Sequence, residues 1–171
     1  MTVPTLRTQR LVLRELCRAD LDNVVRYAGD YDVSKWLVPV CHPYTQSDAD
    51  AFLEMDRLGQ LGSLWVIKQN DAFLGVVSIG KELGYWLGQP AWGQGIMTEA
   101  AGAALSSHFL NRGVEKVCSS YFVGNRASAR VLEKLGFVEV GEKVQFSKAR
   151  NANVAARVVE LTRARWDQSD A

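Results

Sequence analysis

The sequence predicts an α+β (mixed α/β) fold around one central sheet. Segments with the two-residue period of strands alternate with segments of helical period. Their order is strand, two helices, three strands, helix, strand, helix and two strands. No repeat, low-complexity tract or linker divides the 171 residues, so we expect a single domain over residues 1–171.

Charge and cysteine content exclude several classes of partner. The net charge is +1, so no basic field exists that would hold nucleic acid or an anionic membrane. Cys17, Cys41 and Cys118 are odd in number and lack C-x-x-C spacing, which argues against a disulfide framework or a metal site. The longest uncharged stretch, residues 83–98, is too short and polar to cross a bilayer. We therefore expect a cytoplasmic protein without a metal.

The first half of the chain begins with a strand and continues with two helices. Apolar and charged residues alternate over 11–15, which indicates the strand. Asp20 is placed to cap a short helix whose apolar residues recur at helical spacing over 21–28. Residues 30–44 hold two prolines and no sustained period, which predicts a loop. The T-x-x-D sequence that starts at Thr45 is a variant capping box and predicts the next helix.

The second half supplies most of the sheet. Residues 63–69 and 73–79 are rich in strand-forming side chains around an Asn-Asp turn, which predicts a hairpin. The remaining predicted elements are a strand at 82–87, a helix from 95 to about 111, a strand at 115–123, a helix at 125–135 stopped by Gly136, and closing strands at 137–146 and 154–163.

A glycine-rich loop joins the strand ELGYWLG directly to the long helix. This arrangement aims free backbone N–H groups at one point, where the helix dipole favours an anion. Gly93 and Gly95 allow the backbone to approach a ligand closely. The loop lacks the residues of a nucleoside-triphosphate loop and the spacing of a dinucleotide site. A tight connection whose glycines serve only packing is the alternative.

The helix NRASARVLEKLGF has a polar start on an otherwise apolar face. Asn125, Ser128 and Leu132 share that face, although Asn125 could simply cap the helix. Arg130 lies on a second, cationic face with Arg126 and Lys134. That face either meets an anion or is solvated.

Together these segments resemble the GNAT family of acyl-CoA-dependent N-acetyltransferases, and most closely its RimJ/RimL-like branch of ribosomal-protein N-terminal acetyltransferases. The residues that carry the resemblance are ELGYWLG, AWGQGIMTEA, NRASARVLEKLGF and the upstream HPYTQSDADAFL. The resemblance implies a mostly antiparallel sheet flanked by helices, in which the parallel strands 82–87 and 115–123 splay apart. Acetyl-CoA, the acetyl donor, would enter that gap. Relatives are monomers or homodimers.

The resemblance also implies which residues bind the cofactor. They are the backbone of Leu87, Gly93, Gln94, Gly95, Ile96 and Met97, the Asn125 side chain, and Arg130 or its neighbours Arg126 and Lys134. Two positions depart from the family pattern. Pro90 stands where many relatives have Gln or Arg, and Leu132 stands where many have a tyrosine that acts as general acid.

Chemical requirements suggest catalytic candidates for direct attack of a primary amine on the thioester. Glu82 is the candidate base acting through water, with a solvated strand-end carboxylate as the alternative. Ser128 is the first choice to hydrogen-bond the leaving sulfur and Tyr121 the second. The Leu87 N–H is expected to stabilise the oxyanion. Glu99, in the first helical turn, is expected to serve the helix dipole or a structural hydrogen bond.

The acceptor and the reaction type leave alternatives open. A protein N-terminal amino group is the first choice of acceptor, followed by a small molecule such as an aminoglycoside, a polyamine or an amino acid. The segment 30–44, which holds Trp36, would border the acceptor site, and Trp92 would sit at the gap unless it serves only packing. The surface carboxylates could attract a cationic amine or simply be solvated; they are Asp30, Asp32, Glu54 and Asp56. A covalent acyl-enzyme through Cys118 and a non-catalytic acyl-CoA sensor are the competing hypotheses.

Overall fold

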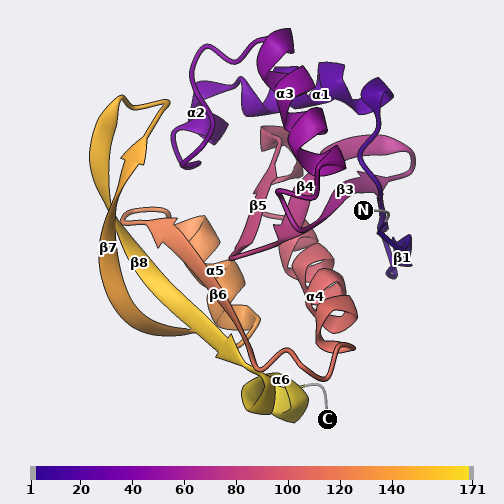
Figure 1. The fold of residues 1–171 in the computed structure, drawn as a ribbon, viewed down its shortest axis with the longest axis vertical. Helices are drawn as coiled ribbons and strands as arrows, with labels where there is room; N and C mark the ends of the chain where they lie inside the picture. The colour runs from indigo at the N-terminus through magenta and orange to yellow at the C-terminus, as the bar shows by residue number, and fades with distance from the viewer. Residues whose placement is uncertain (1–2, 170–171) are drawn as a thin grey trace.

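The computed structural model, which describes residues 3–169, contains one eight-stranded mixed sheet (Figure 1). The strand order is β1-β2-β3-β4-β5-β6-β8-β7, and only β5 and β6 are parallel neighbours. This confirms the predicted mixed, mostly antiparallel class. The strands are β1 (Leu6–Arg7), β2 (Val12–Arg14), β3 (Ser63–Gln69), β4 (Ala72–Ile79), β5 (Leu83–Leu87), β6 (Lys116–Phe122), β7 (Val138–Ser147) and β8 (Ala152–Thr162).

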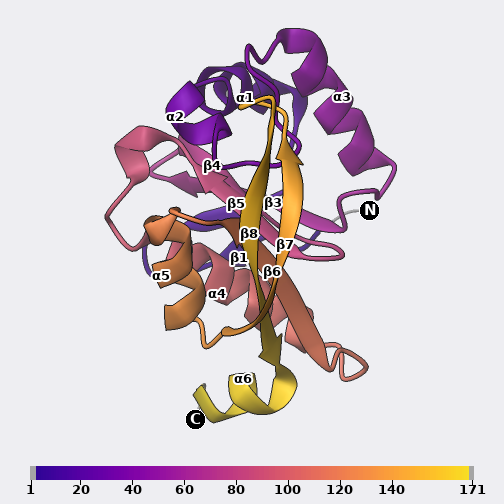
Figure 2. The same cartoon turned by 90° about the vertical axis from the view of Figure 1, so that its left-hand side faces the viewer.

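Helices cover both faces of the sheet. One group gathers at one end of the molecule, at the top of both views, and a second group packs lower down (Figures 1 and 2). The first group is α1 (Leu21–Ala28), α2 (Tyr31–Ser34) and α3 (Gln46–Arg57). The second is α4 (Ile96–Phe109), α5 (Arg126–Lys134) and α6 (Arg163–Ser169). None of the helices in residues 3–169 is long and apolar enough to span a membrane.

Two hydrophobic cores lie on opposite faces of the central strands. Trp65 and Ile67 of β3 face α4 and α5, whereas Leu64 and Val66 face α1 and α3. Successive side chains of a strand point to opposite faces, so a strand covered on both sides needs a continuous apolar run. The run LWVI in β3 meets this requirement. Fully buried alanines in α4 allow that helix to pack closely under the sheet.

Several predicted elements are confirmed, and others differ. The β3–β4 hairpin is present, and Thr45 and Asp48 form the capping box of α3. The two-residue strand β1, the four-residue helix α2 within the predicted loop 30–44, and helix α6 were not predicted. The first two are too short to show a period, so pairing and packing rather than local pattern decide them.

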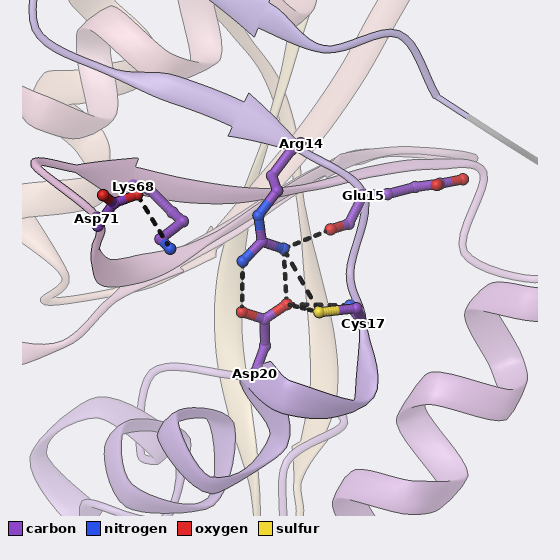
Figure 3. Close-up of polar contacts among 6 residues, drawn as sticks. All are labelled: Arg14, Glu15, Cys17, Asp20, Lys68 and Asp71. Carbon is purple, nitrogen blue, oxygen red and sulfur yellow. Dashed lines mark hydrogen bonds and ion pairs between the residues drawn. The ribbon is translucent and has the colours of Figure 1, made fainter.

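The prediction that the Asp20 side chain caps α1 is wrong. Its carboxylate instead accepts two hydrogen bonds of 2.7 Å from the Arg14 guanidinium and one of 3.0 Å from the Cys17 N–H (Figure 3). Burial raises the pKa of Asp20, but the bonds from Arg14 and Cys17 outweigh it and hold that pKa below its ordinary value. This bidentate pair ties β2 to the turn that leads into α1.

We expect Asp20→Asn to lower the free energy of unfolding by about 2 kcal/mol at pH 7, because the partly buried Arg14 loses its charged and buried partner. A depressed folded-state pKa contributes stability that is present above the unfolded value and lost as pH falls through the folded value. The difference between wild type and variant should therefore shrink in acid below about pH 4. Urea unfolding at several pH values measures it.

Asp50→Asn is the matched control, because Asp50 pairs with Arg18 on the exposed surface. This control should leave stability unchanged. Equal effects of the two substitutions would contradict the structural role of the Arg14–Asp20 pair.

Candidate acetyl-transfer site

The two parallel strands β5 and β6 part after a single registered pair. Leu83 of β5 is opposite Ser119 of β6, and the Ser119 hydroxyl donates to the Leu83 carbonyl at 2.8 Å. No further register between the two strands follows toward Leu87. The predicted splaying of these strands is therefore present, and it leaves backbone groups of β5 facing a gap.

The Leu87 backbone faces this gap. The Gly88 N–H donates to the Leu74 carbonyl of β4 at 2.9 Å, and hydrogen-bonding groups of neighbouring residues in a strand point to opposite sides. The Leu87 N–H therefore points toward β6. The Leu87 carbonyl accepts a hydrogen bond of 2.8 Å from the Trp92 indole.

The glycine loop lies at the mouth of the gap. Gly93 and Gly95 have φ of 73° and 72°, in the left-handed region where a side chain is strained. Among the described residues no hydrogen bond engages the amide N–H groups of residues 93–97. Those donors and the N-terminus of α4 together form an anion-binding surface.

Arg10 holds this loop in place and was missed by the sequence analysis. Its guanidinium donates to Glu99 at 2.7 Å and to the Gln94 carbonyl at 3.0 Å. Burial raises the pKa of Glu99, but hydrogen bonds from Thr8 and Arg10 outweigh it and lower that pKa. Glu99 thus has the structural role that was expected of it. Since 89 residues separate Arg10 from Glu99, no local signal could have revealed the pair.

A cavity of about 840 Å³ runs from the loop to the α1–α3 side of the sheet. It brings together ten of the eleven residues predicted for the site: Glu82, Leu87, Gly93, Gly95, Ile96, Met97, Tyr121, Asn125, Ser128 and Arg130. Gln94 does not line it, because its side chain donates to the Pro90 carbonyl instead. Lys134 lines the cavity as well, whereas Arg126 does not.

Glu82 lies at the cavity wall in a polar cluster. Its carboxylate accepts hydrogen bonds from the Lys143 ammonium at 2.6 Å and from the Ser120 hydroxyl at 2.9 Å. Lys143 reaches it from β7 and Ser120 from β6, so two strands fix the position of this carboxylate, which directly precedes β5. Its role as a base stays a prediction.

Ser128 meets a partner that the sequence analysis did not single out. Its hydroxyl lies 2.9 Å from the Tyr85 hydroxyl, which crosses from β5 to α5. Burial raises the pKa of Tyr85, so the phenol stays protonated and can donate a hydrogen bond. Asn125 caps α5 by accepting from the Ser128 N–H at 3.2 Å, which was the structural alternative for this residue.

The residues of the competing hypotheses lie elsewhere. Cys118 does not line the cavity, and neither does His42 or His108. No three His, Cys, Asp or Glu side chains gather into a metal-binding group within residues 3–169.

Two of the carboxylates expected to attract an amine, Asp30 and Asp32, do not line the cavity. Asp30 accepts a hydrogen bond from Gln89, and Asp32 pairs with Lys35. Trp36 and Trp92 do line it.

A mixed sheet with one parting parallel pair and an amide-rich glycine loop at the gap defines the chain as an acyl-CoA-dependent acetyltransferase. Residues 10–138 match the family model of the acetyltransferase (GNAT) domain. The chain belongs to the GNAT family.

Relatives agree with this assignment. The uncharacterised N-acetyltransferase p20 of Bacillus licheniformis is 27% identical over 160 residues, which cover 85% of this chain and 89% of that protein. Mycobacterium smegmatis RimJ in complex with CoA-disulfide superposes with a TM-score of 0.77 at 20% identity, covering 90% of this chain and 82% of RimJ. Vibrio cholerae spermidine N-acetyltransferase with CoA and spermine has a TM-score of 0.79 at 18% identity, covering 93% and 99%. These two structures share the fold.

We expect Gly95→Ala to destabilise the protein by about 1–2 kcal/mol, because alanine must adopt the left-handed conformation. If the loop relaxes instead, its amides turn away and CoA affinity falls about tenfold. Urea unfolding and calorimetric titration with CoA measure the two effects.

Gly102→Ala is the matched control, within the helix α4 whose N-terminus Gly95 caps. A Cβ at Gly102 would meet only the Leu135 side chain, at 3.7 Å, so this variant should gain about 0.5–1 kcal/mol and bind CoA normally. Unchanged stability together with unchanged CoA affinity of Gly95→Ala would contradict the conformational requirement.

Proposed function

We propose that residues 1–171 form a single N-acetyltransferase domain that transfers the acetyl group of acetyl-CoA to a protein N-terminal amine. The amine attacks the thioester directly in a ternary complex. One observation carries the proposal: a single cavity extends from the glycine loop to the opposite face of the sheet, and no cysteine–histidine pair lines it. The resemblance of the sequence to the RimJ/RimL-like branch of ribosomal-protein N-terminal acetyltransferases supports this acceptor class.

Acetyl-CoA is assigned to the gap between β5 and β6. The amides of residues 93–97 would hold the pyrophosphate, and Arg130 or Lys134 would meet the adenosine phosphate. The pantetheine arm would lie beside β5, where Leu87 offers its backbone, with the Asn125 amide as a further contact. The Leu87 N–H, turned toward the gap, would stabilise the oxyanion of the tetrahedral intermediate.

The acceptor must attack as a neutral amine. A protein α-amine has a pKa of about 8, so about one molecule in ten is neutral at pH 7, whereas only about one lysine amine in 2,500, with a pKa of about 10.4, is neutral at that pH. A modest base acting through water suffices for the α-amine, and we assign Glu82 to this role. The nitrogen forms its bond to the acetyl carbon and releases its proton through water to the Glu82 carboxylate.

The carbon–sulfur bond then breaks and CoA leaves as a thiolate that takes up a proton. A thiol of pKa about 8.5 can depart near neutrality, so a hydrogen-bond donor assists without being obligatory. We assign this donor to the Ser128 hydroxyl, which Tyr85 supports, with Tyr121 as the second choice.

We expect Glu82→Gln to lower kcat about 100-fold and Ser128→Ala to lower it about tenfold, with acetyl-CoA affinity retained. Release of free thiol with a peptide acceptor measures the rate, and calorimetry measures binding. Glu133→Gln on the exposed side of α5 and Cys118→Ser outside the cavity are controls that should keep full activity. Wild-type kcat in both site variants would show that the assigned roles are wrong. Loss of activity in Cys118→Ser would favour the acyl-enzyme.

The rate should depend on pH as the acceptor amine does. Below an acceptor pKa of about 8, kcat/KM for the peptide should rise about tenfold per pH unit and then level off. Stopped-time assays between pH 6 and 9, an illustrative span around that pKa, test this. A flat profile would contradict attack by a free amine. Tight acetyl-CoA binding without any amine-dependent thiol release would favour a non-catalytic sensor.

A further inference from the structure

The half of the cavity on the α1–α3 side has a large apolar wall. Its wall combines Val24 of α1, Phe52 and Met55 of α3, Trp36 and Tyr44 of the segment between those helices, and Trp86 of β5. Phe73 packs against the Trp86 ring from within the core, with ring centroids 5.9 Å apart, and so supports this wall. Transfer of a bulky apolar group from water to such a surface is favourable. A polar chain would lose its hydrogen bonds to water there and find few groups to replace them.

The ionic side chains of the cavity do not favour a polycation. Arg130 and Lys134 lie where the adenosine phosphate is proposed to bind, and the two carboxylates of the cavity, Asp48 and Glu82, are both engaged already. Asp48 already bonds the Thr45 backbone and hydroxyl in the α3 capping box, and these bonds lower its pKa. Glu82 already pairs with Lys143. A ligand with several ammonium groups would therefore bury charges that find no unpaired carboxylate.

One polar group of the apolar wall is available to a ligand. Burial raises the pKa of Tyr44 to about 12, so its hydroxyl stays neutral. This hydroxyl has no hydrogen-bond partner among residues 3–169. A carbonyl or hydroxyl attached to an otherwise apolar acceptor could pair with it.

The two faces of the sheet determine how a bound acceptor would be oriented. Trp86 packs in the core on the α1–α3 face, whereas Tyr85 packs in the core on the α4–α5 face. Glu82 lines the same cavity, and in the proposed mechanism the amine would end its approach beside it. An acceptor with its amine at Glu82 would thus place the group attached to the amine against the apolar wall.

We propose that the acceptor is a primary monoamine that carries a bulky apolar or aromatic group next to the amine, and that this group occupies the pocket around Phe52, Tyr44 and Trp86. The inference rests on the proposed acetyl transfer and specifies its acceptor. Two sources share this chemistry: a polypeptide whose first residue is large and apolar, and a small arylalkyl amine.

An acceptor panel tests the proposal on the full chain. Three peptides that differ only in their first residue, phenylalanine, leucine or serine, are compared with phenethylamine and with spermidine by thiol release from acetyl-CoA. We expect kcat/KM for the best apolar amine to exceed that for the serine peptide and for spermidine by about 10-fold to 100-fold. Activity confined to the peptides identifies a protein N-terminus, and activity confined to phenethylamine identifies a small molecule.

A variant locates the preference in the pocket. Phe52→Ala should raise KM for the apolar amine about tenfold and leave KM for acetyl-CoA unchanged, because Phe52 lies on the acceptor side. Leu58→Ala, at the exposed end of the same helix and outside the cavity, is the control and should change neither.

The failures of the two proposals are distinguishable. Turnover of spermidine or of the serine peptide at least as fast as the apolar amines overturns this inference and leaves acetyl transfer intact. An unchanged preference in Phe52→Ala does the same. Acetyl-CoA binding without turnover of any amine overturns the proposed function itself, and the acceptor assignment with it.

Discussion

The parting of β5 and β6 is the constraint on which the rest of the site depends. Two parallel strands that stayed paired would satisfy each other's backbone groups and leave no room for a ligand. Here Leu83 and Ser119 form the single registered pair, and the Ser119 hydroxyl bonds the Leu83 carbonyl at that junction. Beyond it, β5 continues with unpaired amides that an extended ligand can use in place of a strand.

The sheet at this gap also separates two chemical environments. The alternation of side chains along β5 turns Tyr85 toward α5 and Trp86 toward α1 and α3. Ser128, bonded to Tyr85, therefore belongs to the α5 side, while Glu82 is bonded to Ser120 and Lys143 at the other side of the cavity. In the proposed mechanism, Ser128 as donor to the sulfur and Glu82 as acceptor of the amine proton would act at once, because the strands hold them apart.

The sequence could predict those features that depend on local pattern. The period-two runs gave the strands, the T-x-x-D motif gave the start of α3, and the glycine spacing located the loop at Gly93 and Gly95. What it could not predict depends on residues far apart in the chain. Arg10 meets Glu99 across 89 residues, Lys143 meets Glu82 across 61, and the apolar wall of the cavity combines residues of α1, α3 and β5. Such contacts follow from tertiary packing, which no window of sequence contains.

Leu132 stands where many relatives have a tyrosine, and the structure shows a hydroxyl from another element close to this helix. Leu132 is only 1% exposed and is part of the core beneath α5, so its position on the helix serves packing. A phenol nevertheless reaches the Ser128 hydroxyl, because Tyr85 crosses to it from β5. Its raised pKa keeps that phenol protonated, which orients the serine hydroxyl by a hydrogen bond. The strand thus brings a phenol to α5 where the helix itself has leucine. In the proposed mechanism, the identity of residue 132 alone would not decide whether the leaving sulfur has a donor.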